Sequence, residues 1–563
     1  MRRFYFFPIV FLLLLTTASY SQNENFSMNQ LACGLSQPWE ITWGPDNHLW
    51  VTEAESYQID RIEPTTGTVK MLIDLSDKKD FPDTLDPFPQ GGLMGLAIHP
   101  EIFSGKPYVY IAYVHHFDGC LAGMQGCFFK SKIVRYTYNS TTESLSDEMV
   151  LVDTLPGSND HNGGRLAIGP AGEGQTGMYL FYSIGDMGAG HLRNQDRPNH
   201  AQNINKYEGK ILRFNLEPDG DANAFDSWIP NDNPFNNLGK QNAVWTFGHR
   251  NPQGLVFSPS GTLYEAEHGP YSDDEINIIQ PGVNYGHPLI SGFADGNYDG
   301  SAVGAGTGVP LIASEMANMQ AIQSAYIYKD PIFSLFPAPQ AMVSEIWNND
   351  NNDTPPYDNY FLQWPTAAPS GIHFYNETGI PGWQSSILVA TLKLGRMFRL
   401  KLSNDGQSVV GDTIPYFEDF GRVRDIATNP DGTQIFISLD SSGQLKGAPG
   451  TFIDPPIKGC ILQFTFQSTG VAETYPEDAI RVFPNPADQA LTVDFSALQN
   501  GIERVVLFDV LGTQLFEKQL ERSPETSLEL DLSNLPDGNY LLAVQPADSQ
   551  QRIMKKVTVL RRN

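Results

Sequence analysis

One pattern recurs along the 563-residue chain and restricts the folds that it can adopt. In each copy a polar patch precedes an apolar strand, a tight turn, a second strand and a small or acidic end. The copies are WEITWGPDNHLWVTEA from Trp39, QGGLMGLAIHP (shortened) from Gln90, HNGGRLAIGPAGEGQTGMYLFYSIGD from His161, NPQGLVFSPSGTLYEAEHG from Asn251 and RDIATNPDGTQIFISLD from Arg424. The turns use Pro to fix φ and Gly to allow positive φ. Repeated antiparallel hairpins of this kind predict an all-β fold and favour a β-propeller.

In a propeller, the residues just ahead of each first strand gather at one mouth of the central channel. These residues are polar in every copy: Gln90, Asp160 with His161, Arg250 with Asn251, and Arg422 with Arg424. A single polar loop residue is common and needs no explanation. Several that converge predict a binding site at this mouth.

The four cysteines bear on how the propeller closes. A closed propeller pairs its first and last strands in one sheet, because this removes the open edges. Cys33 lies just before the first repeat and Cys460 begins the final strand, GCILQFTF. We therefore predict a Cys33–Cys460 disulfide that locks the closure. Cys120 and Cys127 would close a short loop, and the sequence leaves their pairing open.

The two ends of the chain differ in character from the repeats. Residues 1–21 begin with Arg2 and Arg3, continue with an apolar run too short to span a bilayer and end in small residues, which predicts a signal peptide cleaved near Ser21. A buried N-terminal strand is the alternative. No later stretch is apolar enough to predict a membrane span. The repeats occupy residues 33–467, residues 468–478 resemble a linker, and residues 479–563 contain short alternating strands that predict a small β-sandwich.

Charge narrows the range of partners. With 64 acidic and 36 basic side chains the formal net charge is −28, which argues against nucleic acid as a partner. In this acidic chain Arg250, Lys393, Arg422 and Arg424 all map to the predicted mouth, which predicts an anionic small ligand. The alternative is that each cation pairs with a local carboxylate, as Arg424 could with Asp425.

Candidates for proton transfer lie in DHNGGR and in the GD dipeptide that follows the next strand. A neutral imidazole held by a carboxylate can accept a proton from an alcohol near neutral pH. His161 with Asp160 and Asp186 fits that description. A structural histidine is the alternative, because spacing alone supports the base role only weakly.

Hard oxygen ligands are concentrated in EHGPYSDDEINIIQPGVNYG and just beyond it. Gly269 and Pro270 offer backbone carbonyls, Tyr285 offers another, and Glu275 and Asp295 offer carboxylates. Ligation by oxygen alone favours Ca²⁺ over zinc, although the EF-hand spacing is absent. An acidic surface loop is the alternative.

These motifs together resemble the soluble pyrroloquinoline quinone (PQQ) dependent glucose and aldose sugar dehydrogenases, the glucose/sorbosone dehydrogenase family. The resemblance runs in order from about Leu35 to Phe466 and lies in DHNGGRLAIGP, YSIGD, GHRNPQGLVFSP, EHGPYSDDEINII with NYG, QWPTAAPSG, ATLKLGRMFRL and GRVRDI. It implies a six-bladed propeller with PQQ and Ca²⁺ in a cleft at one end. It also implies oxidation of the C1 hydroxyl of an aldose to the lactone, with hydride passing to C5 of PQQ.

The resemblance also implies a role for each motif residue. His161 would be the general base, held by Asp186, and Arg250 would stabilise charge on the C5 oxygen. The other implied contacts are Asn251, Thr366, Lys393, Arg422 and Arg424 to PQQ, Gly269 and Pro270 to the Ca²⁺ beside it, Glu275, Tyr285 and Asp295 to a second, structural Ca²⁺, and Gln90, Asp160 and Trp364 to the sugar. The cofactor would supply the redox chemistry and the protein its orientation.

The sequence departs from the family pattern at the expected sugar subsite. His268 stands where Gln is familiar, Gln195 is an uncertain match for a sugar contact, and Phe361 lacks the hydroxyl that Tyr would bring. An apolar contact in place of a hydrogen bond relaxes discrimination between hydroxylated ligands. The preferred sugar therefore stays open, as do the external electron acceptor (quinone, cytochrome or dye) and the oligomeric state.

The C-terminal segment resembles the sorting domain of the type IX secretion system in VFPNPADQALTVDF, LFDVLGTQL, LPDGNYLLAV and KKVTVLR. With the signal peptide it implies passage through the periplasm to the cell surface or the medium, with the type IX machinery as a partner. A carbohydrate-binding or adhesion module is the alternative for this segment. For the whole chain the alternatives are a calcium-dependent lactonase, which would not need the cation cluster, and a non-enzymatic propeller used for binding.

Overall fold

The computed structural model describes residues 24–220, 226–237, 240–352, 360–467, 479–498, 501–508, 514–520, 526–547 and 553–561. The expected signal peptide and the expected linker lie outside the described residues. The chain divides into two compact units, one formed by Ser27–Phe466 and a second that contains Gln467–Asn563. The prediction of a mostly β fold is confirmed, because strands account for nearly all the regular structure of both units.

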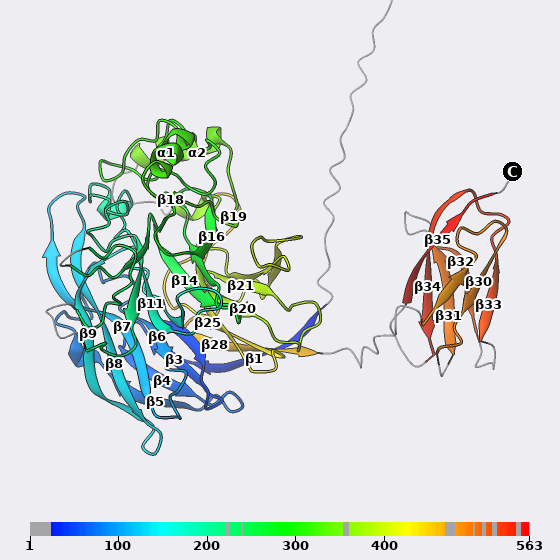
Figure 1. Ribbon diagram of the computed structural model, residues 1–563, viewed down its shortest axis with the longest axis horizontal. Coiled ribbons are helices and arrows are strands. Elements are labelled where there is room, and N and C mark those ends of the chain that lie inside the picture. The colour runs from blue at the N-terminus through cyan, green and yellow to red at the C-terminus, as the bar shows by residue number, and fades with distance from the viewer. Residues whose placement is uncertain are drawn as a thin grey trace, which may run out of the picture. The chain divides into compact units, whose positions relative to one another are not determined.

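Six sheets of at least four strands follow one another along the described part of the larger unit (Figure 1). The first comprises β2 (Pro38–Trp43), β3 (Leu49–Glu53), β4 (Gln58–Ile62) and β5 (Val69–Asp74), and the second β6 (Leu93–Ile98), β7 (Tyr108–Cys120), β8 (Cys127–Asn139) and β9 (Ser144–Ser158). The third comprises β10 (Leu166–Pro170), β11 (Met178–Ile184), β12 (Lys210–Asn215) and β13 (Val244–Phe247), extended by β17 (Val283–Asn284) and β18 (Ile327–Tyr328). The fourth comprises β14 (Pro252–Phe257), β15 (Leu263–Glu267), β16 (Asp274–Ile279) and β19 (Phe333–Leu335), and the fifth β20 (Pro369–Tyr375), β21 (Ser386–Thr391), β22 (Arg396–Lys401) and β23 (Ile414–Tyr416).

The sixth sheet joins the two ends of the larger unit. It has the order β1 (Asn25–Cys33), β28 (Cys460–Gln467), β25 (Gln434–Leu439) and β24 (Val423–Thr428). The Cys33–Cys460 disulfide links the neighbouring strands β1 and β28, and a second disulfide joins Cys120 to Cys127 at the tip of the β7–β8 hairpin. Because β1 begins at Asn25, this sheet starts before residue 33, the boundary expected from the sequence.

The first strands of the six sheets form a ring. Strands β2, β6, β10, β14, β20 and β24 each contact the next in this order, and β24 contacts β2. The second strands are packed on both faces, and all five residues of β3 and of β15 are buried. This burial fits the mainly apolar sequences of β11 and β25, whereas β15 also buries Glu265 and Glu267.

The helices lie in the connections between sheets, and α1 and α2 lie together at one end of the larger unit (Figure 1). The short elements are α1 (Glu315–Gln323), α2 (Gln340–Asn352), the 3-10 turns Ser76–Lys78, Leu192–Asn194 and Tyr360–Gln363, and a ribbon of β26 (Leu445–Lys446) and β27 (Phe452–Ile453). Val343 and Ile346 of α2 pack in one apolar cluster with Tyr271 and Trp364. Among the described residues, the helices are too short or too polar to cross a membrane.

The smaller unit contains two sheets around one apolar core. One sheet has the order β29 (Arg481–Phe483), β30 (Ala490–Asp494), β33 (Ser527–Asp531), and the other β32 (Gln514–Gln519), β31 (Ile502–Phe508), β34 (Gly538–Pro546), β35 (Ile553–Val559). Leu491 and Leu530 from the first sheet share the core with Val505, Leu542 and Val557 from the second. The alternating sequence of these strands therefore places one face of each sheet inside.

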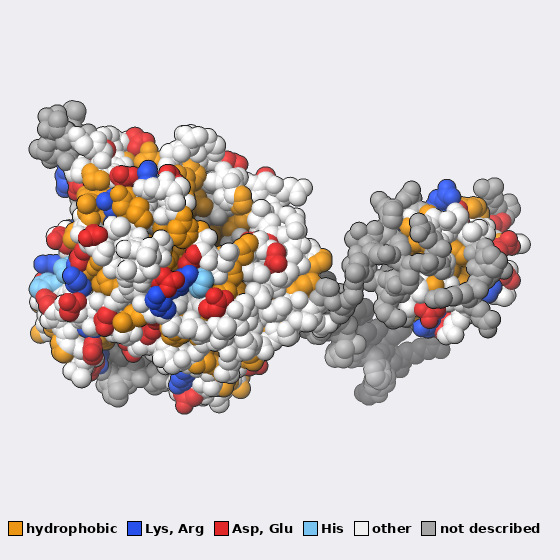
Figure 2. Space-filling view, turned by 90° about the horizontal axis from the view of Figure 1, so that it is seen from below, with side chains coloured by type: hydrophobic (Ala, Val, Ile, Leu, Met, Phe, Trp, Pro, Cys, Tyr) orange, Lys and Arg blue, Asp and Glu red, His pale blue; other side chains and the backbone are white. Residues whose placement is uncertain are grey.

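The surface mixes charges of both signs. On the face seen in Figure 2, Lys, Arg, Asp and Glu side chains lie in small groups among neutral polar ones. A protein that binds nucleic acid through phosphates instead presents a continuous basic surface.

Candidate active site

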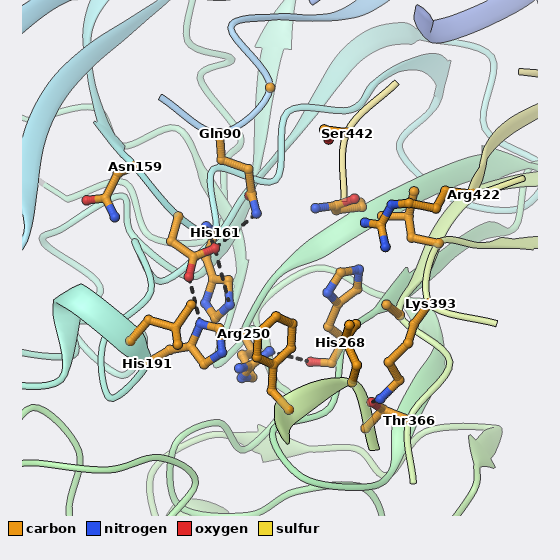
Figure 3. Close-up of a pocket in the computed structure, with 18 of the residues that line it drawn as sticks. Gln90, Asn159, His161, His191, Arg250, His268, Thr366, Lys393, Arg422 and Ser442 are labelled. Carbon is orange, nitrogen blue, oxygen red and sulfur yellow. Dashed lines mark hydrogen bonds and ion pairs between the residues drawn. The ribbon is translucent and has the colours of Figure 1, made fainter. Parts of the chain in front are cut away.

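The ring brings the sequence-predicted polar residues to one face. Gln90, His161, Arg250 and Arg422 precede the first strands of their sheets, whereas Asp186 and Lys393 follow second strands. In antiparallel sheets these two kinds of position lie at the same end. A cleft of about 610 Å³ opens there (Figure 3). Its lining includes the predicted residues Gln90, Asp160, His161, Arg250, Gly269, Pro270, Trp364, Thr366, Lys393, Arg422 and Arg424.

His161 and Asp186 form a buried pair in this cleft. His161 Nδ1 lies 2.7 Å from Asp186 Oδ1, and both residues are at most 3% exposed. The other carboxylate oxygen accepts from Asn199 Nδ2 (3.0 Å) and lies 2.8 Å from His287 Nε2. The residue before Asp186 is Gly185, where a Cβ would meet the carbonyl oxygen of His161 at 2.0 Å. A glycine is therefore needed for the two loops to approach this closely.

The environment of His161 suits a proton acceptor. Burial, the largest cause, lowers the pKa of His161, and the opposing charges of Asp160 and Asp186 do not reverse the shift. Burial alone would raise the pKa of Asp186, but the charge and hydrogen bond of His161 outweigh it, so that pKa lies below its usual range. An ionised Asp186 holds the proton of the neutral imidazole on Nδ1 and leaves Nε2 free to accept one.

A second histidine lies against the first. The rings of His161 and His191 stack with centroids 5.3 Å apart and planes 15° apart (Figure 3). His191 Nδ1 lies 2.6 Å from Asp160 Oδ2, while Asp160 Oδ1 accepts from Gln90 Nε2 at 3.0 Å and from the His161 backbone N–H at 3.0 Å. Trp364 meets His191 edge to face. The expected sugar-subsite residues Gln90, Asp160 and Trp364 thus surround a histidine that the sequence analysis did not single out.

Three of the predicted cations have only neutral oxygens as partners. Arg250 Nη1 donates to the His268 carbonyl (3.3 Å), and Arg422 Nη1 to the Gln444 carbonyl (2.8 Å). Lys393 Nζ donates to the Trp364 carbonyl at 2.9 Å and to the Thr366 hydroxyl. Among the described residues, no carboxylate oxygen forms an ion pair with any of these three side chains.

Burial disfavours the charge on two of these cations. Burial lowers the pKa of Lys393 to about 7, against the opposing charge of Asp274. Burial also lowers the pKa of Arg422. The positive charge in the cleft is thus poorly compensated by the protein.

Arg424 differs from the other three because it pairs with a carboxylate. Its Nη2 contacts Asp440, and its Nη1 donates to Gln253 Oε1 at 2.9 Å. The alternative pairing with Asp425 does not form, because Asp425 Oδ2 accepts from Arg165 Nη1 (2.8 Å) and from the Ile41 backbone N–H (2.8 Å).

Several buried side-chain nitrogens in or near the cleft lack a partner within the described structure. They are His268 Nε2, Trp364 Nε1 and Arg422 Nε of lining residues, and Nδ2 of the predicted residue Asn251, which the lining does not include. Asn251 is fully buried, and its Oδ1 accepts from the Gly163 backbone N–H at 3.2 Å. Unsatisfied buried polar atoms are rare, and a group at a cleft suggests that a ligand completes their hydrogen bonds.

The predicted calcium ligands separate into two sets. Gly269 and Pro270 line the cleft, and among the described contacts neither carbonyl oxygen accepts a hydrogen bond. Glu275, Tyr285 and Asp295 lie outside the lining: Glu275 accepts from the Gly292 N–H at 2.8 Å, the Tyr285 hydroxyl donates to the Ile278 carbonyl at 2.6 Å, and Asp295 is exposed. No described hydrogen bond joins any two of these three. A second Ca²⁺ at this position stays a prediction.

Several lining residues were not singled out as functional from the sequence, among them His191, Leu192 and Gln253. His191 and Leu192 line the cleft where Gln195 was considered, and Gln195 itself does not. Gln253 also lines the cleft. It lies near the start of the repeat that begins at Asn251, so its position in the repeat could have predicted that it lies at the channel mouth. No repeat marked His191, which lies in an irregular connection between β11 and β12.

Comparisons with known proteins agree with this arrangement. The family described as Glucose / Sorbosone dehydrogenase matches residues 35–322 and 344–446, and the family described as Secretion system C-terminal sorting domain matches residues 481–560. The chain is 33% identical over 475 residues to quinoprotein glucose dehydrogenase B of Acinetobacter calcoaceticus, covering 80% of this chain and 92% of the relative. It is 27% identical over 446 residues to the aldose sugar dehydrogenase YliI of Escherichia coli, covering 78% of this chain and 97% of the relative.

Solved structures support the fold. A PQQ-bound aldose sugar dehydrogenase from Streptomyces coelicolor aligns with a TM-score of 0.51 at 22% identity, covering 79% of this chain and all of that one. The apo form of the soluble aldose sugar dehydrogenase from Escherichia coli aligns with a TM-score of 0.52 at 24% identity, with the same 79% of this chain and 100% of that one covered.

Proposed function

The chain belongs to the glucose/sorbosone dehydrogenase family, and from this we propose that it is a PQQ- and Ca²⁺-dependent dehydrogenase that oxidises the C1 hydroxyl of aldose sugars to the lactone. The observation that carries the proposal is a cluster of cations without carboxylate partners beside the His161–Asp186 pair. A lactonase needs no such cluster.

The cleft fits a planar tricarboxylate such as PQQ. Arg250, Lys393 and Arg422 line it and offer positive charge without a direct carboxylate partner, and Arg422 Nε in the lining and Asn251 Nδ2 outside it are buried donors without partners. We propose that Asn251, Thr366, Lys393, Arg422 and Arg424 hold PQQ, as the family resemblance implies. The free carbonyl oxygens of Gly269 and Pro270 suit a hard cation, and they would hold Ca²⁺ beside it.

PQQ, when bound, supplies a quinone carbonyl that accepts a hydride. His161 would accept the proton of the C1 hydroxyl on Nε2, and Asp186 would stabilise the resulting imidazolium through Nδ1. Arg250 would present positive charge to an oxygen that gains negative charge in the cleft. Gln90, Asp160 and Trp364 would orient the sugar, with His191 in the same wall.

Reconstitution tests this proposal. We expect the purified protein with PQQ and Ca²⁺ to oxidise aldoses in a dye-linked assay, and sugar to bleach the spectrum of the bound oxidised cofactor. We expect His161→Ala to lose at least a thousandfold in kcat, because the base is removed, while its Kd for PQQ stays within threefold of the parent. PQQ binding without oxidation of any sugar in a broad aldose panel would contradict the substrate class and favour a binding module.

For the architecture, we propose that the six sheets are the six blades of a closed propeller and that the smaller unit is a β-sandwich. The sorting-domain match supports export through the type IX machinery to the cell surface or medium, after a signal peptide at residues 1–21. Deletion of residues 468–563 is expected to leave the protein in the periplasm, measured by fractionation against the full chain. Equal export of both forms would contradict this role.

A further inference from the structure

Gln253 occupies an unusual position behind the cation cluster. It lies in β14, is 2% exposed and lines the cleft. Its side-chain Oε1 accepts from Arg424 Nη1 at 2.9 Å and from Ser370 Oγ at 3.3 Å. Ser370 Oγ also contacts Arg424 Nη1 at 3.3 Å, so three groups from the fourth, fifth and sixth sheets meet at one guanidinium nitrogen.

The backbone of Gln253 is fixed by a buried arginine. The Gln253 carbonyl accepts from Arg165 Nε at 3.0 Å, and Arg165 Nη1 donates to Glu40 at 2.6 Å and to Asp425 at 2.8 Å. The Arg165 guanidinium also lies over the Trp39 ring at 4.4 Å. We call Arg165, Glu40 and Asp425 the Arg165 brace. It ties the Gln253 backbone to the first and sixth sheets, while Ser370 and Arg424 hold the side-chain amide oxygen.

The chemistry of an amide matters at this position. Arg424 already pairs with Asp440 through Nη2. A second carboxylate at Nη1 would reverse the local charge, whereas a neutral amide oxygen fixes the guanidinium without cancelling its charge. The brace meanwhile keeps Asp425, the neighbour of Arg424 in sequence, bound to Arg165.

We propose that Gln253, held in place by the Arg165 brace, is a positioning residue that orients Arg424 toward an anionic cofactor without adding a second negative charge to the Arg424–Asp440 pair. This inference rests on the proposed function, because it assigns Arg424 to PQQ. It predicts that Gln253 affects cofactor binding only through Arg424.

A double-mutant cycle tests the inference, with the Kd of PQQ measured by fluorescence titration on the Ca²⁺-loaded full chain. We expect Gln253→Leu to raise the Kd about tenfold, since an oriented charge-assisted contact is lost. Gln253→Glu is expected to raise it further, because a second carboxylate beside the Arg424–Asp440 pair makes the local charge negative. In the Arg424→Met background, Gln253→Leu is expected to change the Kd by less than twofold.

Gln463→Leu is the matched control, because Gln463 is a buried glutamine of β28 outside the cleft lining, and its Kd is expected to equal that of the parent. Gln253→Met replaces Gln253→Leu if the leucine variant does not fold. A parent that does not bind PQQ overturns the proposed function. A parent that binds, with Gln253→Leu within twofold of it, or with the same tenfold loss in both backgrounds, overturns the inference about Gln253 alone.

Discussion

Two sets of cations lie beside strand ends of the ring and have opposite side-chain partners. The Arg165 guanidinium is held by the carboxylates of Glu40 and Asp425, whereas the side-chain nitrogens of Arg250, Lys393 and Arg422 donate only to neutral oxygens within the described structure. A buried charge without a countercharge costs several kcal/mol of folding free energy. The brace therefore serves the fold, whereas the cleft cations, which Asp274 and Asp440 oppose without forming an ion pair with Lys393 or Arg422, suit the proposed anionic ligand.

The largest expected effect comes from removing Arg165. Arg165→Met leaves two buried carboxylates without their partner, so we expect the free energy of unfolding to fall by about 3–5 kcal/mol in urea titrations. Arg396→Met removes a partly exposed pair with Glu418 and is expected to cost about 1 kcal/mol or less. Equal losses in the two variants would mean that the brace is not a stabilising element.

Arg422→Met is expected to weaken PQQ binding without lowering the stability of the apo protein. The apo protein should unfold at the same or a higher urea concentration, because an uncompensated buried charge is removed, while the Kd for PQQ rises about tenfold or more. Urea unfolding without PQQ and fluorescence titration with PQQ measure the two effects. A loss of apo stability comparable to that of Arg165→Met would contradict the claim that Arg165 stabilises the fold and Arg422 does not.

Lys393 is expected to make both apo stability and PQQ binding depend on pH. Its pKa of about 7 in the apo protein lies below its unfolded value, so between pH 7 and the unfolded pKa the unfolded state binds more protons and apo stability rises with pH. The carboxylates of PQQ would stabilise the charged form of Lys393, so PQQ binding is expected to be coupled to uptake of a proton between pH 7 and the unfolded pKa of this lysine. We expect the Kd for PQQ to rise by up to about tenfold per pH unit above pH 7. Titrations from pH 6 to 9 should show this slope in the parent and a weaker one in Lys393→Met, and identical slopes would contradict it.

The smallest effect is expected at His191. His191→Phe keeps a ring against His161 but loses the hydrogen bond to Asp160, so kcat/KM for aldoses should fall about threefold to tenfold. The Kd for PQQ should not change, because His191 lies across the cleft from Lys393 and Arg422 (Figure 3). A changed Kd with unchanged kcat/KM would place His191 in the cofactor site instead.

Most of the sheet structure could be predicted from the sequence because the hairpins share turn chemistry. The repeats from Trp39, His161, Asn251 and Arg424 correspond to β2–β3, β10–β11, β14–β15 and β24–β25. The hairpin of the fifth sheet was not recognised as a repeat, because the connection between Tyr375 and Ser386 is long and lacks the tight turn of the other copies. Helices α1 and α2 lie in connections between strands that no repeat predicts.

The cleft was harder to predict where irregular connections contribute. Residues at the ends of strands, such as Arg250 and Lys393, could be assigned to the channel mouth from their position relative to those strands. The position of His191 depends instead on the connection from Asp186 to Lys210. Lys210 Nζ donates to the carbonyls of His200, Ala201 and Glu208, at 3.1, 2.8 and 2.6 Å, and so fixes the end of that connection. Contacts of this kind follow from tertiary packing and have no sequence periodicity.

The sharing of one sheet by β1 and β28 also bears on when the protein can fold. Cys33 and Cys460 are 427 positions apart, so the contact that completes the sixth sheet has very high sequence separation. β1 is synthesised first, and almost the whole sequence of the larger unit must follow before its neighbour arrives. Until then the edge of β25 that receives β28 stays open to other strands. The last strand of the larger unit thus completes the sixth sheet, and a chain truncated before residue 460 would leave β1 without its neighbour β28.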